Sequence, residues 1–132
     1  MFITLAIAHL SPGTATLTIS NAGHSPALRR SAGHLEHCPA DGPPIGVLDR
    51  QGYGMNRWDF SGEDLLFLGS DGWTDQTKSD GEMFGEDRLA AELLAAGTSS
   101  SNLMTRLVDT VDHYANGDDQ VDDLTALILQ GA

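Results

Sequence analysis

Residues 65–75 read LLFLGSDGWTD, a short apolar run that ends in an aspartate-bearing corner, Ser70-Asp71-Gly72-Trp73-Thr74-Asp75. A second corner, Gln120-Val121-Asp122-Asp123-Leu124-Thr125, opens the apolar run 124–129. Both runs are continuous and apolar, which predicts strands that are buried on both faces. These two strands and their corners organise the rest of the predicted fold.

Two amphipathic helical patterns lie between these strands. The first covers Glu86–Ala96, and the second places leucines, a valine and a tyrosine at helical spacing between Leu103 and Tyr114. One helix leads away from the end of the first strand and the other leads back. The last strand then begins where the first one ended and runs antiparallel to it. This topology predicts that Asp71 and Asp122 lie at the same edge of one sheet.

Converging carboxylates repel each other when no Lys or Arg lies between them, unless a cation neutralises them. We therefore predict a site for Mg²⁺ or Mn²⁺ with Asp71 and Asp122 as ligands and their carboxylates within roughly 6 Å of each other. The alternative is structural, because Asp-Gly is a common turn and Asp-Asp can be a solvated end of a loop. Either corner alone favours the turn; the two corners at one edge favour the metal.

The first half of the chain is predicted to be β-structure. Ser11-Pro12-Gly13 predicts a hairpin turn between the first two strands. Five strands are expected there, at residues 2–10, 14–21, 27–30, 35–37 and 52–60. With the two helices, the pattern predicts an α/β architecture of the α+β sandwich type: mainly antiparallel β-sheets, with the two C-terminal helices packed on one face.

Six short blocks of sequence, in the same order, resemble the SpoIIE-type branch of the metal-dependent protein phosphatases, relatives of the type 2C serine/threonine phosphatases. The blocks are Asn21-Ala22-Gly23-His24-Ser25-Pro26, Gly42-Pro43-Pro44-Ile45-Gly46, Gly62-Glu63-Asp64-Leu65-Leu66, Ser70-Asp71-Gly72-Trp73-Thr74-Asp75, Phe84-Gly85 and Asp122-Asp123-Leu124-Thr125. Together they cover almost the whole chain. This makes the resemblance far more specific than any one block.

The resemblance implies hydrolysis of phosphoserine or phosphothreonine by a water bound at a two-metal centre. It assigns metal ligation to Asp71 and Asp122, and it places Asp75 where the family has an acidic residue, most often Glu in this branch. It also implies a phosphoprotein substrate, since this branch commonly acts on small regulators such as anti-sigma-factor antagonists.

One part of the family pattern has no counterpart here. The N-terminal part of the family's domain supplies an Asp-x-x-Gly-His-Gly-type segment that bridges the metals, whereas no Asp or Glu precedes Glu36 in this chain. We therefore expect residues 1–132 to be a single domain that forms the C-terminal portion of a SpoIIE-like phosphatase domain, with an incomplete catalytic set. A non-catalytic remnant that acts as a binding or regulatory domain is the second hypothesis, and an acidic binding module without metal is the third.

Composition excludes several classes of protein. A net charge of −12 over 132 residues argues against a nucleic-acid-binding surface, which would be basic. No apolar stretch approaches the roughly 20 residues of a membrane helix, so no membrane association is expected. The single Cys38 fits a reducing compartment, and a cytoplasmic location is expected. Residues 2–7 are apolar and uncharged, which predicts an adhesive edge and a homodimer built through it.

Histidine and arginine side chains are further candidates for site residues. His24 is expected to have a structural or loop-ordering role rather than to act as a general acid, because it has no partner that would tune it. The other histidines have no ligand-like spacing, so no zinc site is predicted. Arg29 and Arg30 are neighbours on a strand and must point to opposite faces, so at most one could meet a phosphate.

Overall fold

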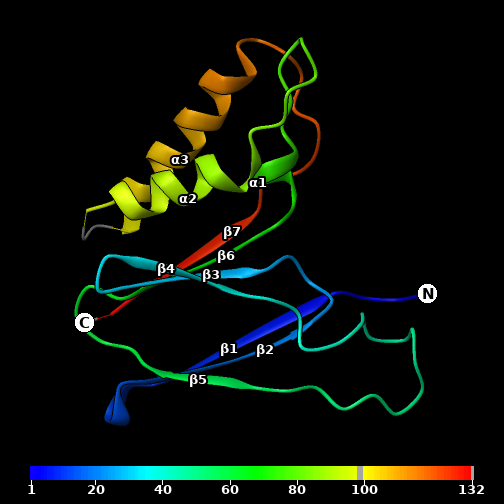
Figure 1. Ribbon diagram of the computed structural model, residues 1–132, viewed down its shortest axis with the longest axis vertical. Coiled ribbons are helices and arrows are strands. Elements are labelled where there is room, and N and C mark those ends of the chain that lie inside the picture. Colours follow the sequence, from blue (N-terminus) through cyan, green and yellow to red (C-terminus); the bar gives the residue numbers. More distant parts are fainter. Residues whose placement is uncertain (98–99, 132) are drawn as a thin grey trace.

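The computed structural model describes residues 1–97 and 100–131 and contains two stacked β-sheets, with helices over the outer face of one of them (Figure 1). All paired strands are antiparallel. The first sheet has the strand order β1-β2-β5 and the second the order β4-β3-β6-β7. The elements are β1 (Leu5–Ser11), a 3₁₀ turn η1 (Pro12–Thr14), β2 (Thr16–Ala22), β3 (Ala27–Ser31), β4 (His34–Cys38), β5 (Asn56–Asp59), β6 (Leu65–Gly69), α1 (Gly72–Asp75), α2 (Gly85–Ala95), α3 (Ser100–Ala115) and β7 (Ala126–Gln130).

This architecture confirms the predicted α/β class, and each predicted strand and helix has a counterpart. The predicted first strand begins earlier than the observed one. Residues 2–4 lie outside β1, and of these Ile3 alone forms an isolated bridge, to Ile45. The short helix α1 was not predicted, since four residues are too few to show helical periodicity. Within the described residues, no helix is long and apolar enough to cross a membrane.

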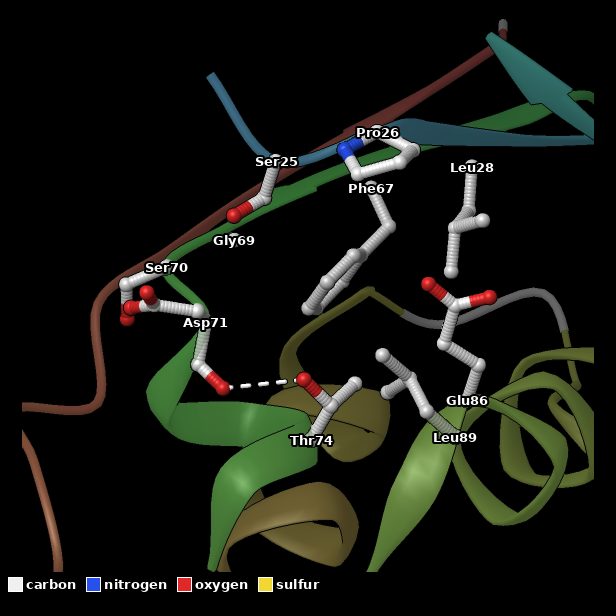
Figure 2. Close-up of a pocket in the computed structure, with 10 residues that line it drawn as sticks. All are labelled: Ser25, Pro26, Leu28, Phe67, Gly69, Ser70, Asp71, Thr74, Glu86 and Leu89. Atoms are coloured by element: carbon white, nitrogen blue, oxygen red, sulfur yellow. Dashed lines mark hydrogen bonds between the residues drawn. The ribbon is translucent and has the colours of Figure 1, made fainter. Parts of the chain in front are cut away.

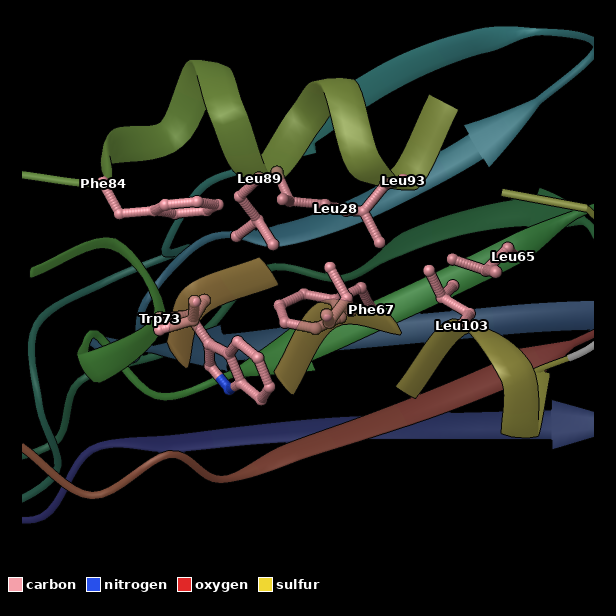
Figure 3. Packing of buried hydrophobic residues seen from close by; sticks show 10 residues of the cluster. Leu28, Leu65, Phe67, Trp73, Phe84, Leu89, Leu93 and Leu103 are labelled. Carbon is pink, nitrogen blue, oxygen red and sulfur yellow. The ribbon is translucent and has the colours of Figure 1, made fainter. Parts of the chain in front are cut away.

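Strand β6 is the centre of the packing, and its alternating side chains serve two cores. Leu65 and Phe67 face α2 and α3, while Leu66 faces the first sheet. The helix-side core is drawn in Figure 3. Its buried members are Leu28, Leu65, Phe67, Trp73, Phe84, Leu89, Leu93, Leu103, Leu107 and Val111. The prediction that this first strand is buried on both faces is thus confirmed.

The same prediction for the final strand is confirmed only in part. Within the described part of the chain β7 pairs only with β6, and its Leu127 remains 50% exposed. Ile128 packs against the helix-side core and Leu129 against the core between the sheets. Each face of β7 thus contacts a core, but the strand lies at the edge of the sheet, and Leu127 stays accessible to solvent there.

The two arginines of β3 point to opposite faces, as predicted, and both serve the fold. The Arg30 guanidinium is buried and donates to the carbonyl oxygens of Leu93 (2.9 Å), Ala96 (2.6 Å) and Glu63 (3.3 Å). It therefore binds the C-terminal end of α2, where unpaired carbonyl groups favour a cation. Arg29 lies on the other face, pairs with Glu36 at 3.0 Å and stacks over Trp58.

Replacing the buried arginine should destabilise the fold. An Arg30→Met variant leaves the carbonyl groups at the end of α2 without their donor, so its free energy of unfolding should fall by about 1.5–3 kcal/mol in urea titrations. The exposed Arg57 is the matched control, and Arg57→Met should change the free energy of unfolding by less than about 0.5 kcal/mol. Equal effects of the two substitutions would contradict this role of Arg30.

Candidate metal centre

The two aspartate corners are joined by hydrogen bonds through Ser70. Its backbone N–H donates to the Thr125 carbonyl oxygen at 2.9 Å. Its hydroxyl donates to the Asp123 carbonyl oxygen at 2.7 Å and accepts from the Thr125 N–H at 3.1 Å. The structure therefore brings together the backbones of the two corners, which are distant in sequence.

Trp73 adds a second anchor between the same corners. Its indole N–H donates to the Thr125 carbonyl oxygen at 2.9 Å, and its side chain is 1% exposed. The ring packs edge-on against Phe67, with the ring centroids 6.0 Å apart. Because Trp73 belongs to α1, this contact fixes the short helix against the beginning of β7.

Gly72 lies where the corners approach most closely. A Cβ at this position would lie 2.6 Å from the Asp123 carbonyl oxygen and 3.3 Å from that of Asp122. Real Cβ atoms do not come within 3.0 Å of backbone oxygens, so the approach requires glycine. The Asp-Gly pair at residues 71–72 is therefore more than a turn signal.

Asp71 and Asp122 lie on these touching corners, and both are exposed to solvent. Asp71 precedes α1, and its carbonyl oxygen accepts from the Thr74 hydroxyl at 3.0 Å. An Asp122 carboxylate oxygen accepts from the Asp123 N–H at 2.7 Å. Asp75 is half-buried and accepts from the Thr74 hydroxyl at 3.2 Å. The separation of the Asp71 and Asp122 carboxylates stays a prediction.

The carboxylate oxygens of Asp71 and Asp122 are the type of ligand that a hard divalent cation prefers. Mg²⁺ in proteins keeps several waters and takes one or two carboxylates, and two exposed aspartates on adjoining corners can supply these. Over residues 1–97 and 100–131, however, no group of three or more His, Cys, Asp or Glu side chains is arranged to hold a metal ion. An ion bound at these two carboxylates would take its other ligands from water or from other groups.

A cavity of about 230 Å³ adjoins Asp71 (Figure 2). It is smaller than the ~300–1,000 Å³ of most small-molecule sites. The apolar part of its wall comes from Pro26, Leu28, Phe67 and Leu89. Its polar part comes from Ser25, Ser70, Asp71, Thr74 and Glu86. Sequence reasoning missed Ser25 and Glu86 as neighbours of Asp71, because their meeting depends on how β3 and α2 pack.

The loop that carries Ser25 is ordered by Asn21, a buried side chain that sequence reasoning did not select. The Asn21 amide donates to the carbonyl oxygens of His24 (3.1 Å) and Ser25 (3.2 Å) and accepts from the His24 N–H at 2.8 Å. Asp41 accepts from the Asn21 N–H at 2.8 Å. The His24 ring nitrogen Nδ1 lies 3.2 Å from the Ser25 carbonyl oxygen, so His24 forms part of this turn.

Among the described residues four side chains have shifted pKa values, and none of them is a ligand candidate: Cys38, Lys78, Glu82 and Arg88. Burial, reinforced by the Glu36 carboxylate, raises the pKa of the Cys38 thiol to about 11, so it is protonated and unreactive at neutral pH. The pKa of Glu82 is lowered, first by its hydrogen bond to Lys78 and then by that to Arg88. Both cations also lie over the ring of Tyr114.

Adding one methyl group at the contact between the corners should separate them. In Gly72→Ala the new Cβ meets backbone rather than a flexible side chain, so the free energy of unfolding should fall by about 1–3 kcal/mol. Gly13→Ala is the matched control, because its Cβ would enter open space, and it should be neutral or slightly stabilising. Thermal unfolding of both variants gives the comparison. A neutral Gly72→Ala would show that the corners are not in contact.

Comparison with known proteins identifies the family. The family model of Stage II sporulation protein E (SpoIIE) matches residues 1–131. Protein IcfG of Synechocystis sp. (strain ATCC 27184 / PCC 6803 / Kazusa) is 24% identical over 130 residues, which are 98% of this chain and 20% of that protein.

Two solved structures share the fold. The SiaA-PP2C domain of Pseudomonas aeruginosa superposes with a TM-score of 0.82 at 20% identity, over 96% of this chain and 51% of that one. The phosphatase domain of the cell fate determinant SpoIIE from Bacillus subtilis gives 0.73 at 15% identity, over 97% and 56%. The chain thus spans about half the length of these phosphatase domains. With the family match over almost its whole length, the chain belongs to the SpoIIE family, and it shares its fold with the matched PP2C phosphatase domains.

Proposed function

We propose that residues 1–132 are the C-terminal portion of a metal-dependent protein serine/threonine phosphatase domain. The reaction is hydrolysis of phosphoserine or phosphothreonine on a regulatory protein by a metal-activated water. The observation that carries this proposal is the contact between the corners of Asp71 and Asp122 in a member of the SpoIIE family. The chain covers about half of the matched domains, so in this proposal the activity requires residues in addition to these 132.

In this proposal Asp71 and Asp122 bind Mn²⁺ or Mg²⁺. When bound, such an ion lowers the pKa of a coordinated water and stabilises charge on a phosphoryl oxygen. The chain's own contribution is placement: Ser70 and Trp73 hold the two corners together, and Gly72 allows their close approach. The cavity beside Asp71 can receive one side chain of the substrate protein next to its phosphorylated residue.

The second candidate function is a non-catalytic, phosphatase-like domain that binds or regulates a partner. The observation that favours it is the absence of a third ligand group within the described residues, since a two-metal site must hold ions about 3.5–4 Å apart. In either case the proposed partner is a phosphoprotein, such as an anti-sigma-factor antagonist. A cytoplasmic location is proposed from the single cysteine.

The activity of this chain should separate these functions. With Mn²⁺ it should hydrolyse a generic phosphatase substrate little faster than its Asp71→Ala variant, because the ligand set is incomplete. Robust turnover that Asp71→Ala abolishes would show that the chain holds a complete centre. Asp109→Ala, which removes an exposed carboxylate from α3, is the control for loss of charge. An acidic module without metal would lose no Mn²⁺ affinity in Asp71→Ala or Asp122→Ala.

We also propose a homodimer through the N-terminal edge. Phe2 is 65% exposed, Ile3 60% and Ile7 56%, and β1 has a strand neighbour on one side only within the described residues. Burial of apolar surface is favourable by about 25 cal/mol per Å², whereas charge repulsion is screened beyond about 8 Å at physiological salt.

Light scattering at tens of micromolar should therefore report a dimer. Ile3→Lys should give a monomer, because it places a charge in the buried contact. Leu94→Lys is the matched control, since it changes an exposed leucine on α2 and should leave the dimer intact. A clean monomer for the unmodified chain would contradict this proposal.

A further inference from the structure

The loop between α3 and β7 carries Asp122 but has no regular structure of its own. After Asp122 it is anchored by Ser70 and Trp73, which contact residues 123 and 125. A position that serves as a metal ligand needs restraint on both sides, because an error of a few tenths of an ångström weakens coordination. The restraint before Asp122 comes from Gln76.

Gln76 is 1% exposed, and both polar atoms of its side-chain amide are hydrogen-bonded. The side-chain NH₂ donates to the carbonyl oxygens of Asp119 (3.2 Å) and Thr77 (3.0 Å). The side-chain oxygen accepts from the Val121 N–H at 3.2 Å. The amide thus binds the loop at both residues 119 and 121, immediately before Asp122.

The backbone of Gln76 is fixed as well. Its carbonyl oxygen accepts from the Phe84 N–H at 2.7 Å, and Phe84 is buried in the helix-side core. Gln76 directly follows α1, the helix that begins after Asp71. Its side chain therefore connects the segment that follows Asp71 to the loop that carries Asp122.

We propose that Gln76 is a positioning residue for the metal centre: it holds the Asp122 loop at the distance and orientation that Asp71 requires. This rests on the proposed function, in which both aspartates bind the cation. Ser70, Trp73 and Gln76 all belong to the segment of Asp71, and between them they anchor the second corner on both sides of Asp122. No carboxylate could replace Gln76, because it would face the carbonyl oxygens of Asp119 and Thr77 without a proton to donate.

Gln76→Met tests this assignment, since it keeps the length of the side chain and removes all three hydrogen bonds. In ¹⁵N-labelled protein, Mn²⁺ broadens the amide signals near its site, and titration gives an apparent affinity. Gln76→Met should weaken that affinity by about 10–100-fold, the usual effect of losing a residue that orients a metal ligand. Without metal, amide exchange at Val121 should become faster in Gln76→Met, while Thr125, which bonds to Ser70, should keep its protection.

Two controls separate positioning from general stability. Gln51→Met makes the same chemical change at an exposed residue, and Leu93→Ala removes a side chain that is 0% exposed, on α2. Leu93→Ala should lower the unfolding temperature at least as much as Gln76→Met and yet keep the affinity for Mn²⁺. An equal loss of affinity in Leu93→Ala would overturn the positioning role.

Failure of this inference differs from failure of the proposed function. If Asp71→Ala and Asp122→Ala weaken Mn²⁺ binding but Gln76→Met does not, the positioning role is wrong and the metal site stands. If the aspartate variants bind Mn²⁺ as the unmodified chain does, the proposed metal site is wrong. Unchanged exchange at Val121 in Gln76→Met would show that the side chain does not hold the loop.

Discussion

The antiparallel pairing of β6 with β7 is the constraint on which the rest of the structure depends. Its register places Gly69 opposite Ala126, so the end of one strand meets the beginning of the other. The corner after β6 and the corner before β7 must then share one edge of the sheet. Gly72 permits the backbones to touch, and Ser70 joins them by hydrogen bonds. The corners that carry the two aspartates become neighbours as a consequence of strand order.

The loop that carries Asp122 is held in place by elements that the helix-side core fixes. The helix-side core fixes β6, α1 and α2, and Trp73 and Gln76 extend that rigidity to the loop of Asp122. Under the proposed function, the remaining ligands of a two-metal site would come from other groups, since the chain spans about half of the matched domains. Strands β1 and β7 both lie at a sheet edge, since each has one strand neighbour within the described residues.

Patterns local in sequence predicted much of the fold and of the candidate site. The continuous apolar run at residues 65–68 predicted that β6 is buried on both faces, and the shared edge of the two aspartate corners followed from the order strand, helix, helix, strand. The opposite directions of Arg29 and Arg30 followed from strand geometry alone. The exposure of Leu127 could not be predicted, because it depends on which strand lies at the edge of the sheet. Gln76 and Asn21 were missed for a related reason: a buried amide is recognised by its hydrogen-bond partners, and for Gln76 these are Asp119 and Val121, brought near only by folding.

The most direct test of the central claim is the position of a bound ion. Crystals of the chain soaked in Mn²⁺ should show an anomalous-scattering peak between Asp71 and Asp122, at coordination distance of about 2.0–2.6 Å from a carboxylate oxygen of each. A peak elsewhere, or carboxylates more than about 10 Å apart and thus beyond strong coupling, would contradict the claim that these two corners form a metal site.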